Sequence, residues 1–90
     1  MKIRMIDDVV WRELADEVVL LNLTTGLYFG LDGTGGKIWK VLADQGTTEA
    51  AIEAIVAEYD ATREQVEADV IRLVDELRDK GLIEIDPDGD

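Results

Sequence analysis

The sequence of 90 residues contains no cysteine and no histidine. Without cysteine the chain has no disulfide framework, no thiolate zinc site and no cysteine nucleophile. Histidine is the commonest general base and metal ligand in proteins, so its absence removes the usual routes to acid–base catalysis and metal binding. These two absences favour a binding module over an enzyme.

Basic residues are scarce: the chain has nine Lys and Arg and 21 Asp and Glu, which gives a net charge of −12. Nucleic-acid phosphates would be repelled, so no nucleic-acid partner is expected. The acidity is uneven: residues 46–90 carry a net charge of −10 and residues 1–45 only −2. A charged partner of the C-terminal half is therefore expected to be basic.

Long apolar runs are also missing. No stretch approaches the ~20 apolar residues of a membrane span. The N-terminus, MKIRMIDDVV, has neither the apolar core nor the small-residue cleavage site of a signal peptide. A cytoplasmic location without a membrane partner is expected.

The N-terminal third is predicted to form three strands, between about residues 8 and 31. Runs rich in β-formers cover Val9–Leu14, Glu17–Leu23 and Leu27–Leu31. The links are short, Ala15-Asp16 and Thr24-Thr25-Gly26, and the glycine suits a hairpin position with positive φ. Two short links predict a three-stranded antiparallel meander whose first and third strands are edges.

After the glycine-rich turn at residues 32–36, apolar residues recur at the three- and four-residue spacing of a helix. Helices are predicted at about 34–45, 48–59 and 62–80, with Thr47 or Thr48 capping the second and Thr62 with Gln65 the third. Gly81 ends the third helix, a short extended segment follows over residues 82–85, and 86–90 form an acidic tail. The predicted fold class is α+β, a three-stranded antiparallel sheet followed by a three-helix winged-helix-like unit.

With 47% apolar residues, the chain is expected to fold as one domain, residues 1–90, around a thin core. Trp39, at helical spacing with Leu42, is predicted to be buried. Trp11 is also predicted to belong to the core, with a half-exposed side chain as the alternative because it lies on an edge strand. The buried stripe of the third helix is expected to comprise Val66, Val70, Leu73, Val74 and Leu77.

Two segments resemble ligand loops only superficially. Asp32–Lys37 lacks the leading glycine and the hydroxyl after lysine that a phosphate loop requires, so we interpret it as a strand-to-helix turn. The C-terminal tail ends before the twelve residues and closing glutamate of a calcium loop. No cofactor and no metal site are predicted.

The third predicted strand is a candidate peptide-binding edge. Leu27, Phe29 and Leu31 alternate with Tyr28 and Gly30, so the two sets face opposite sides of the sheet. The strand has none of the lysine, proline or inward charge that usually protects an exposed edge. An extended peptide can add to such an edge as a further strand. The alternative is that this chain or a second copy covers the edge.

Either shoulder of the third helix is a candidate border for a groove beside that strand. At 100° per residue, one shoulder carries Gln65, Asp69, Arg72 and Glu76. The other carries Glu67, Ile71 and Arg78. Pattern alone does not choose between the two shoulders.

With these features the chain resembles the PqqD-like proteins, or RiPP recognition elements, over Val9–Ile85, nearly its whole length. These are small domains that bind the leader peptides of ribosomally made natural products. The residues that carry the resemblance are Val19–Asn22, Gly26–Asp32, Thr34-Gly35, Ile38-Trp39, Val41-Leu42, Thr48, Ile52, Ile55-Val56, Tyr59, Val66, Asp69-Val70, Leu73, Leu77 and Gly81–Ile83. Asp32-Gly33 stands where the family tends to have asparagine before the Thr-Gly turn, a conservative change.

The resemblance implies a non-catalytic function, in which a precursor's leader docks as a fourth strand on the third strand, beside the third helix. Leu73 would floor an apolar pocket, while the charged rim would favour a leader with lysines. The expected peptide-binding residues are Leu27, Tyr28, Phe29, Gly30, Leu31, Asp69, Arg72, Leu73 and Glu76.

The resemblance also implies enzyme partners. In lasso peptide biosynthesis, which we favour, they are a leader peptidase and a macrolactam cyclase. The alternative is a PqqD-type peptide chaperone for a radical SAM or other modifying enzyme. A winged-helix DNA-binding regulator is disfavoured by the acidic C-terminal half, and an acidic adaptor without a peptide ligand is a further alternative. The chain is expected to be a monomer or a weak dimer.

Overall fold

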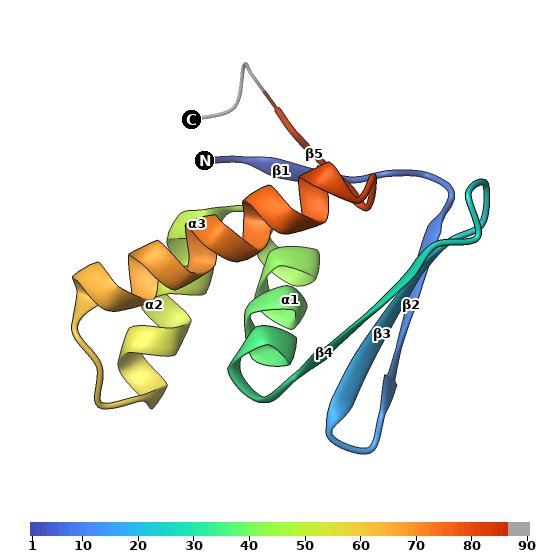
Figure 1. The fold of residues 1–90 in the computed structure, drawn as a ribbon. Coiled ribbons are helices and arrows are strands. Elements are labelled where there is room, and N and C mark those ends of the chain that lie inside the picture. Colours follow the sequence, from blue (N-terminus) through green and yellow to red (C-terminus); the bar gives the residue numbers. More distant parts are fainter. Residues whose placement is uncertain (87–90) are drawn as a thin grey trace.

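The computed structural model describes residues 1–86. Its elements are β1 (Ile3–Met5), β2 (Val9–Leu14), β3 (Glu17–Asn22), β4 (Tyr28–Asp32), α1 (Gly33–Gln45), α2 (Thr48–Glu58), α3 (Arg63–Asp79) and β5 (Ile83–Ile85). The antiparallel sheet β2-β3-β4 lies to one side of the three helices (Figure 1). The predicted fold class is confirmed. Apart from Asp86, the predicted acidic tail lies outside the described residues.

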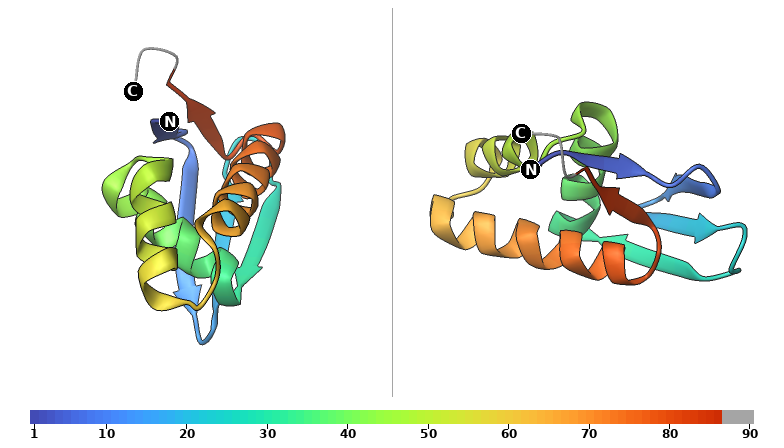
Figure 2. Two further views of the ribbon diagram at one scale, coloured as in Figure 1. Left: turned by 90° about the vertical axis from the view of Figure 1, so that its left-hand side faces the viewer. Right: turned by 90° about the horizontal axis from the view of Figure 1, so that it is seen from above.

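A second, two-stranded sheet was not predicted. β1 pairs antiparallel with β5, with Ile3 opposite Ile85 and Met5 opposite Ile83. The extended segment after Gly81 is therefore confirmed as a strand, but its partner lies at the other end of the chain. A three-residue strand is too short to show an alternating pattern. Figure 2 shows this ribbon beside the C-terminal end of α3.

The helix boundaries follow the predicted caps. The Thr47 hydroxyl accepts a hydrogen bond from the Ala50 N–H (3.2 Å), and the Thr62 hydroxyl accepts one from the Gln65 N–H (3.2 Å). Gly46 ends α1 with φ at 78°, the left-handed conformation that glycine adopts without strain. These caps fix the three short helices at the positions their sequences indicate.

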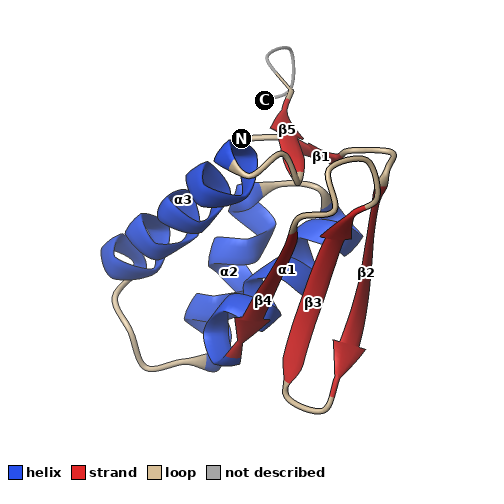
Figure 3. Ribbon diagram, turned by 45° about the vertical axis from the view of Figure 1, so that its right-hand side comes forward, coloured by secondary structure: helices blue, strands red, loops and turns tan. Residues whose placement is uncertain are grey.

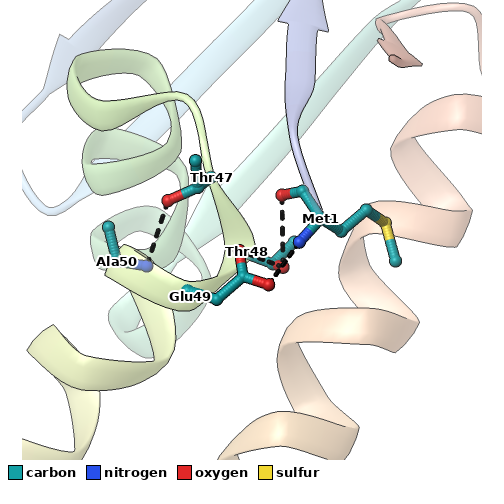
Figure 4. Close-up of polar contacts among 5 residues, drawn as sticks. All are labelled: Met1, Thr47, Thr48, Glu49 and Ala50. Atoms are coloured by element: carbon teal, nitrogen blue, oxygen red, sulfur yellow. Dashed lines mark hydrogen bonds and ion pairs between the residues drawn. The ribbon is translucent and has the colours of Figure 1, made fainter. Parts of the chain in front are cut away.

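The start of α2 also holds the N-terminal segment (Figure 4). The Thr48 N–H donates to the Met1 carbonyl (2.9 Å), and the Glu49 carboxylate pairs with the Met1 ammonium. The hydrogen bond from that ammonium lowers the pKa of the Glu49 carboxyl. Thr48 is already the first residue of α2, so Thr47 rather than Thr48 is the cap.

The core lies between the sheet and the helices, and Trp39 is fully buried in it, as predicted. Trp11 is 37% exposed, so the half-exposed alternative for this residue is the correct one. β2 is the edge strand away from the helices (Figure 3), so only part of the Trp11 ring is covered. Its ring meets Trp39 edge-on, with centroids 6.0 Å apart.

Asp32–Lys37 is the predicted strand-to-helix turn. Asp32 ends β4, and α1 begins at Gly33, which has φ at 52°. The Lys37 ammonium pairs with the Glu58 carboxylate of α2, so this lysine ties two helices together. Within residues 1–86, no helix is both long and apolar enough to cross a membrane.

Candidate functional site

The hydrogen-bonding direction of β3 follows from two bonds at its end. The Asn22 N–H donates to the Leu27 carbonyl (2.9 Å), on the side of β4. The Leu23 N–H donates to the Asp8 carbonyl (2.8 Å), on the side of β2. In an antiparallel sheet these directions alternate along a strand. The even-numbered residues of β3 therefore bond toward β4 and the odd-numbered ones toward β2.

This alternation determines which main-chain groups of β4 are free. Phe29 and Leu31 lie opposite even-numbered residues of β3, so their N–H and C=O groups face β3. The N–H and C=O groups of Tyr28, Gly30 and Asp32 face the other way. Among residues 1–86, no strand pairs with that side of β4, which is an edge of the sheet. The edge therefore presents alternate main-chain donors and acceptors to an incoming strand.

A groove lies between α1 and α3, with a volume of about 270 Å³. Its lining combines the start of α1 with one shoulder of α3: Thr34, Gly35, Ile38, Asp69, Arg72, Leu73 and Glu76. All four α3 residues predicted for the site lie here. The shoulder that carries Ile71 does not line it, so the groove runs along the Asp69–Glu76 shoulder.

The groove has an apolar floor and an acidic rim. Ile38 and Leu73 form the floor and are only 3% and 9% exposed. On the rim, the Arg72 guanidinium pairs with the Asp69 carboxylate at 2.8 Å. The Glu76 carboxylate has no ion pair within the described part of the chain. Two carboxylates against one guanidinium leave the rim negative.

The groove adjoins the inner face of β4. A Cβ atom at Gly35 would lie 3.5 Å from Leu31 Cδ2, so the groove wall touches this strand directly. Farther along, the Lys80 ammonium at the end of α3 lies 5.4 Å from the centre of the Phe29 ring. In both views of Figure 2, β4 and α3 lie on the same side of the molecule. Edge and groove therefore form one continuous site.

The predicted strand residues divide between the two faces. Phe29 is half-buried and Leu31 buried on the helix side, whereas Tyr28 is 70% exposed on the outer side with Gly30. Leu27 precedes β4 and is exposed, so the predicted strand began one residue too early.

Three groove residues were missed by sequence reasoning: Thr34, Gly35 and Ile38. The sequence feature that could have indicated them is the Thr-Gly turn after an edge strand, which we interpreted only as the boundary between a strand and a helix. A helix that starts at the end of an edge strand brings its first turn beside that edge. The sequence therefore contained enough information to predict these three residues as part of the site.

The geometry has counterparts among solved structures. The chain is similar to TbiB1 in complex with the TbiA(beta) leader peptide, at 42% identity and a TM-score of 0.87, covering 94% of this chain and 99% of that one. It also shares its fold with lasso peptide synthetase B1 complexed with the leader peptide, at 24% identity and a TM-score of 0.85, covering 94% of this chain and 100% of that one.

Comparison with curated proteins yields no match. The family described as coenzyme PQQ synthesis protein D matches residues 17–83, which span the sheet from β3 onward, all three helices and the start of β5. The match covers both the open edge of β4 and the groove-lining shoulder of α3. This chain belongs to the PqqD family.

Proposed function

We propose that this protein binds the leader segment of a ribosomally made precursor peptide as a fourth strand on β4. The observation that carries the proposal is the free edge of β4, with the main-chain groups of Tyr28, Gly30 and Asp32 directed outward beside the groove. The 42% identical TbiB1 has a structure in complex with a leader peptide, which supports the same role here. The protein itself performs no chemistry and acts by binding.

An added strand would use the two parts of the site differently. Main-chain hydrogen bonds to β4 hold any extended peptide, so they contribute affinity with little sequence preference. Alternate side chains of the peptide then point toward the groove, where Ile38 and Leu73 accept apolar groups and Glu76 favours a cation. Specificity therefore resides in the groove. The affinity is expected to be moderate, because a flexible leader loses conformational entropy when it becomes ordered on binding.

The proposed consequence of binding is delivery. A bound leader raises the local concentration of its precursor near the enzymes that process it. We propose a leader peptidase and a lasso cyclase as those enzymes, as the sequence resemblance implies. A PqqD-type chaperone role for a radical SAM enzyme is the second candidate, because the matched family is described by coenzyme PQQ synthesis.

The decisive experiment is a titration of the protein with a fluorescently labelled leader peptide from the neighbouring precursor gene, followed by amide NMR. Saturable binding with shifts confined to residues 28–35 and 69–76 is expected. Absence of saturation with every encoded leader would overturn the proposal. Pull-down of purified leader peptidase, or of a radical SAM enzyme, by the leader-bound protein then separates the two pathways.

The acidic rim is expected to contribute charge selectivity. Asp69→Asn combined with Glu76→Gln should weaken binding of a lysine-containing leader by about three- to tenfold at low salt, since rim charges act through screened attraction. The salt dependence of the dissociation constant should fall in parallel. Leader titrations at two ionic strengths measure both quantities.

A matched control lies on the same helix. Glu67→Gln with Asp75→Asn removes the same two charges outside the groove, and Asp75, like Asp69, pairs with an arginine three residues on. This control should change leader affinity by less than about twofold. Equal losses in the two double variants would mean that net charge, and not the rim, governs binding.

Leu73 is expected to serve both the core and the groove. Leu73→Ala should lower the unfolding free energy by about 2–3 kcal/mol, the lower part of the range for buried leucine, because the groove side is open. Leader affinity should fall as well, whereas Leu73→Met, of similar volume, should retain both properties. Denaturant unfolding and leader titration of the two variants test whether Leu73 contributes to both stability and leader binding. Unchanged leader affinity in folded Leu73→Ala would remove Leu73 from the binding surface.

A further inference from the structure

One basic residue at the end of α3 has no carboxylate partner. The three arginines of this helix each pair with a carboxylate: Arg63, Arg72 and Arg78. Lys80, which caps the end of α3, forms no ion pair within residues 1–86, although the chain has 21 acidic residues. Lys80 follows Glu76 by four residues, a spacing at which glutamate and lysine can pair along a helix, yet these two do not.

The Lys80 side chain is directed at β4 instead. Its ammonium lies 5.4 Å from the centre of the Phe29 ring, and both side chains are half-buried. An ammonium has three N–H donors and the ring covers one side of it, so donors remain for an acceptor. Tyr28 and Gly30, the neighbours of Phe29, direct their main-chain groups at the free edge. The ammonium therefore lies on the helix side of the edge to which a leader would add.

The main chain around Lys80 is fixed before a leader binds. The Lys80 N–H donates to the Glu76 carbonyl (3.1 Å), and the Gly81 N–H donates to the Arg78 carbonyl (3.0 Å). The Gly81 carbonyl in turn accepts a hydrogen bond from Asn22 Nδ2 (2.9 Å), next to the turn that precedes β4. A lysine held in this way loses less conformational entropy on pairing than a lysine on a free loop.

The charge of the site changes sign along β4. Near Leu31 the groove rim is negative, because two carboxylates stand against one guanidinium, whereas near Phe29 the Lys80 ammonium is positive. Glu76 and Lys80 are one helical turn apart, about 6 Å along the axis. Side chains on one face of a strand recur every ~6.8 Å. Two successive helix-facing side chains of a leader therefore match the spacing of these two charges.

We infer that Lys80 binds an acidic side chain of the leader, two residues away from the side chain that meets Glu76. This inference rests on the proposed leader binding. The strand pairs of this sheet are antiparallel, so a leader that continues the pattern runs from Leu31 toward Phe29. The acidic residue therefore follows the groove-binding residues in the leader sequence. Lys80 selects both a residue type and the position of the leader along β4.

The net charge of the protein predicts the opposite effect for an acidic leader residue. At a net charge of −12, long-range repulsion disfavours a leader carboxylate, so its replacement by an amide should strengthen binding. Contact with Lys80 reverses this effect at one leader position, because the amide loses a charge-assisted hydrogen bond. The direction of the change in affinity therefore distinguishes a contact with Lys80 from the general field.

The test uses the full chain and the fluorescently labelled leader peptide of the neighbouring precursor gene. In a set of leader peptides, each Asp or Glu is replaced singly by Asn or Gln. Lys80→Gln removes the ammonium. Arg78→Gln is the matched control, because it removes one positive charge from the last turn of α3 outside the groove lining. Anisotropy at low salt measures leader affinity, and denaturant unfolding checks that both variants are folded.

One amide replacement should weaken binding to the wild type by about three- to tenfold and change binding to Lys80→Gln by less than about twofold. For the native leader, Lys80→Gln should lose about three- to tenfold in affinity and Arg78→Gln less than about twofold. Lys80→Glu should regain affinity for a leader that has lysine at the same position. Exchange of the acidic leader residue with the residue two positions before it should weaken binding to the wild type at least as much.

Three results overturn the inference and leave leader binding intact. The first is stronger or unchanged binding of the wild type for every amide replacement. The second is an equal loss in Lys80→Gln and Arg78→Gln, because net charge would then be the cause. The third is native affinity for the leader with exchanged residues, because Lys80 would then not set its position. Failure of the wild type to bind the native leader instead overturns the proposed function.

Discussion

Gly30→Pro is expected to weaken leader binding by at least about tenfold while the protein stays folded. Proline lacks the N–H group that Gly30 directs at the free edge, and a lost main-chain hydrogen bond costs about 0.5–1.5 kcal/mol. The pyrrolidine ring also occupies the path of the incoming strand. Because this N–H faces away from β3, no bond of the sheet is lost, and edge strands tolerate proline at such positions.

Two neighbouring variants separate the lost N–H group from other effects. Gly30→Ala adds the same Cβ atom, which meets only the flexible end of the Glu17 side chain, but retains the N–H group. Its leader affinity should stay within about twofold of the wild type. Phe29→Pro should instead destabilise the protein strongly, because the Phe29 N–H faces β3 and proline removes this hydrogen bond from within the sheet.

Leader titration by anisotropy and denaturant unfolding are the measurements for all three variants. If folded Gly30→Pro binds leader like Gly30→Ala, the leader does not add to β4. If Gly30→Pro unfolds while Phe29→Pro remains stable, the hydrogen-bond alternation of β4 is the reverse of that deduced from its neighbours.

The contrast between residues 29 and 30 shows where sequence reasoning reaches its limit. Alternation along β4 correctly predicted which side chains share a face, because side-chain direction has a period of two within one strand. Which N–H groups are free depends on the register with β3, and the register depends on the turn at Thr24–Gly26. Pattern analysis identified the open edge but could not assign its donors.

The features that were missed depend on distant partners. β1 was not predicted, and neither was its pairing with β5 across nearly the whole chain. Trp11 is partly exposed because the helices pack nearer the other edge of the sheet. The α3 stripe and the caps at Thr47 and Thr62 were predictable because each depends on neighbours within one or two turns.

Asn22→Ala is expected to cause a large loss of stability, about 2–4 kcal/mol in unfolding free energy, because each partner left unpaired costs about 1–3 kcal/mol. Asn22 is only 5% exposed. Its Oδ1 accepts from the N–H groups of Thr24 (2.9 Å) and Thr25 (3.1 Å), and its Nδ2 donates to the Gly81 carbonyl (2.9 Å). Thr24→Ala, which removes one exposed hydrogen bond of the same turn, from the Thr24 hydroxyl to the Asp8 carboxylate, is the control.

The partners of Asn22 make it a link between the turn that precedes β4 and the end of α3. Its Oδ1 shapes the β3–β4 turn, and its Nδ2 ties that turn to the end of α3. Asn22→Asp keeps the acceptor for the turn but has no donor for Gly81, so it should release α3 from β4 selectively. Leader affinity should then fall by more than the fraction of unfolded protein explains. Wild-type affinity in folded Asn22→Asp would show that β4 and α3 keep their relative position without this link.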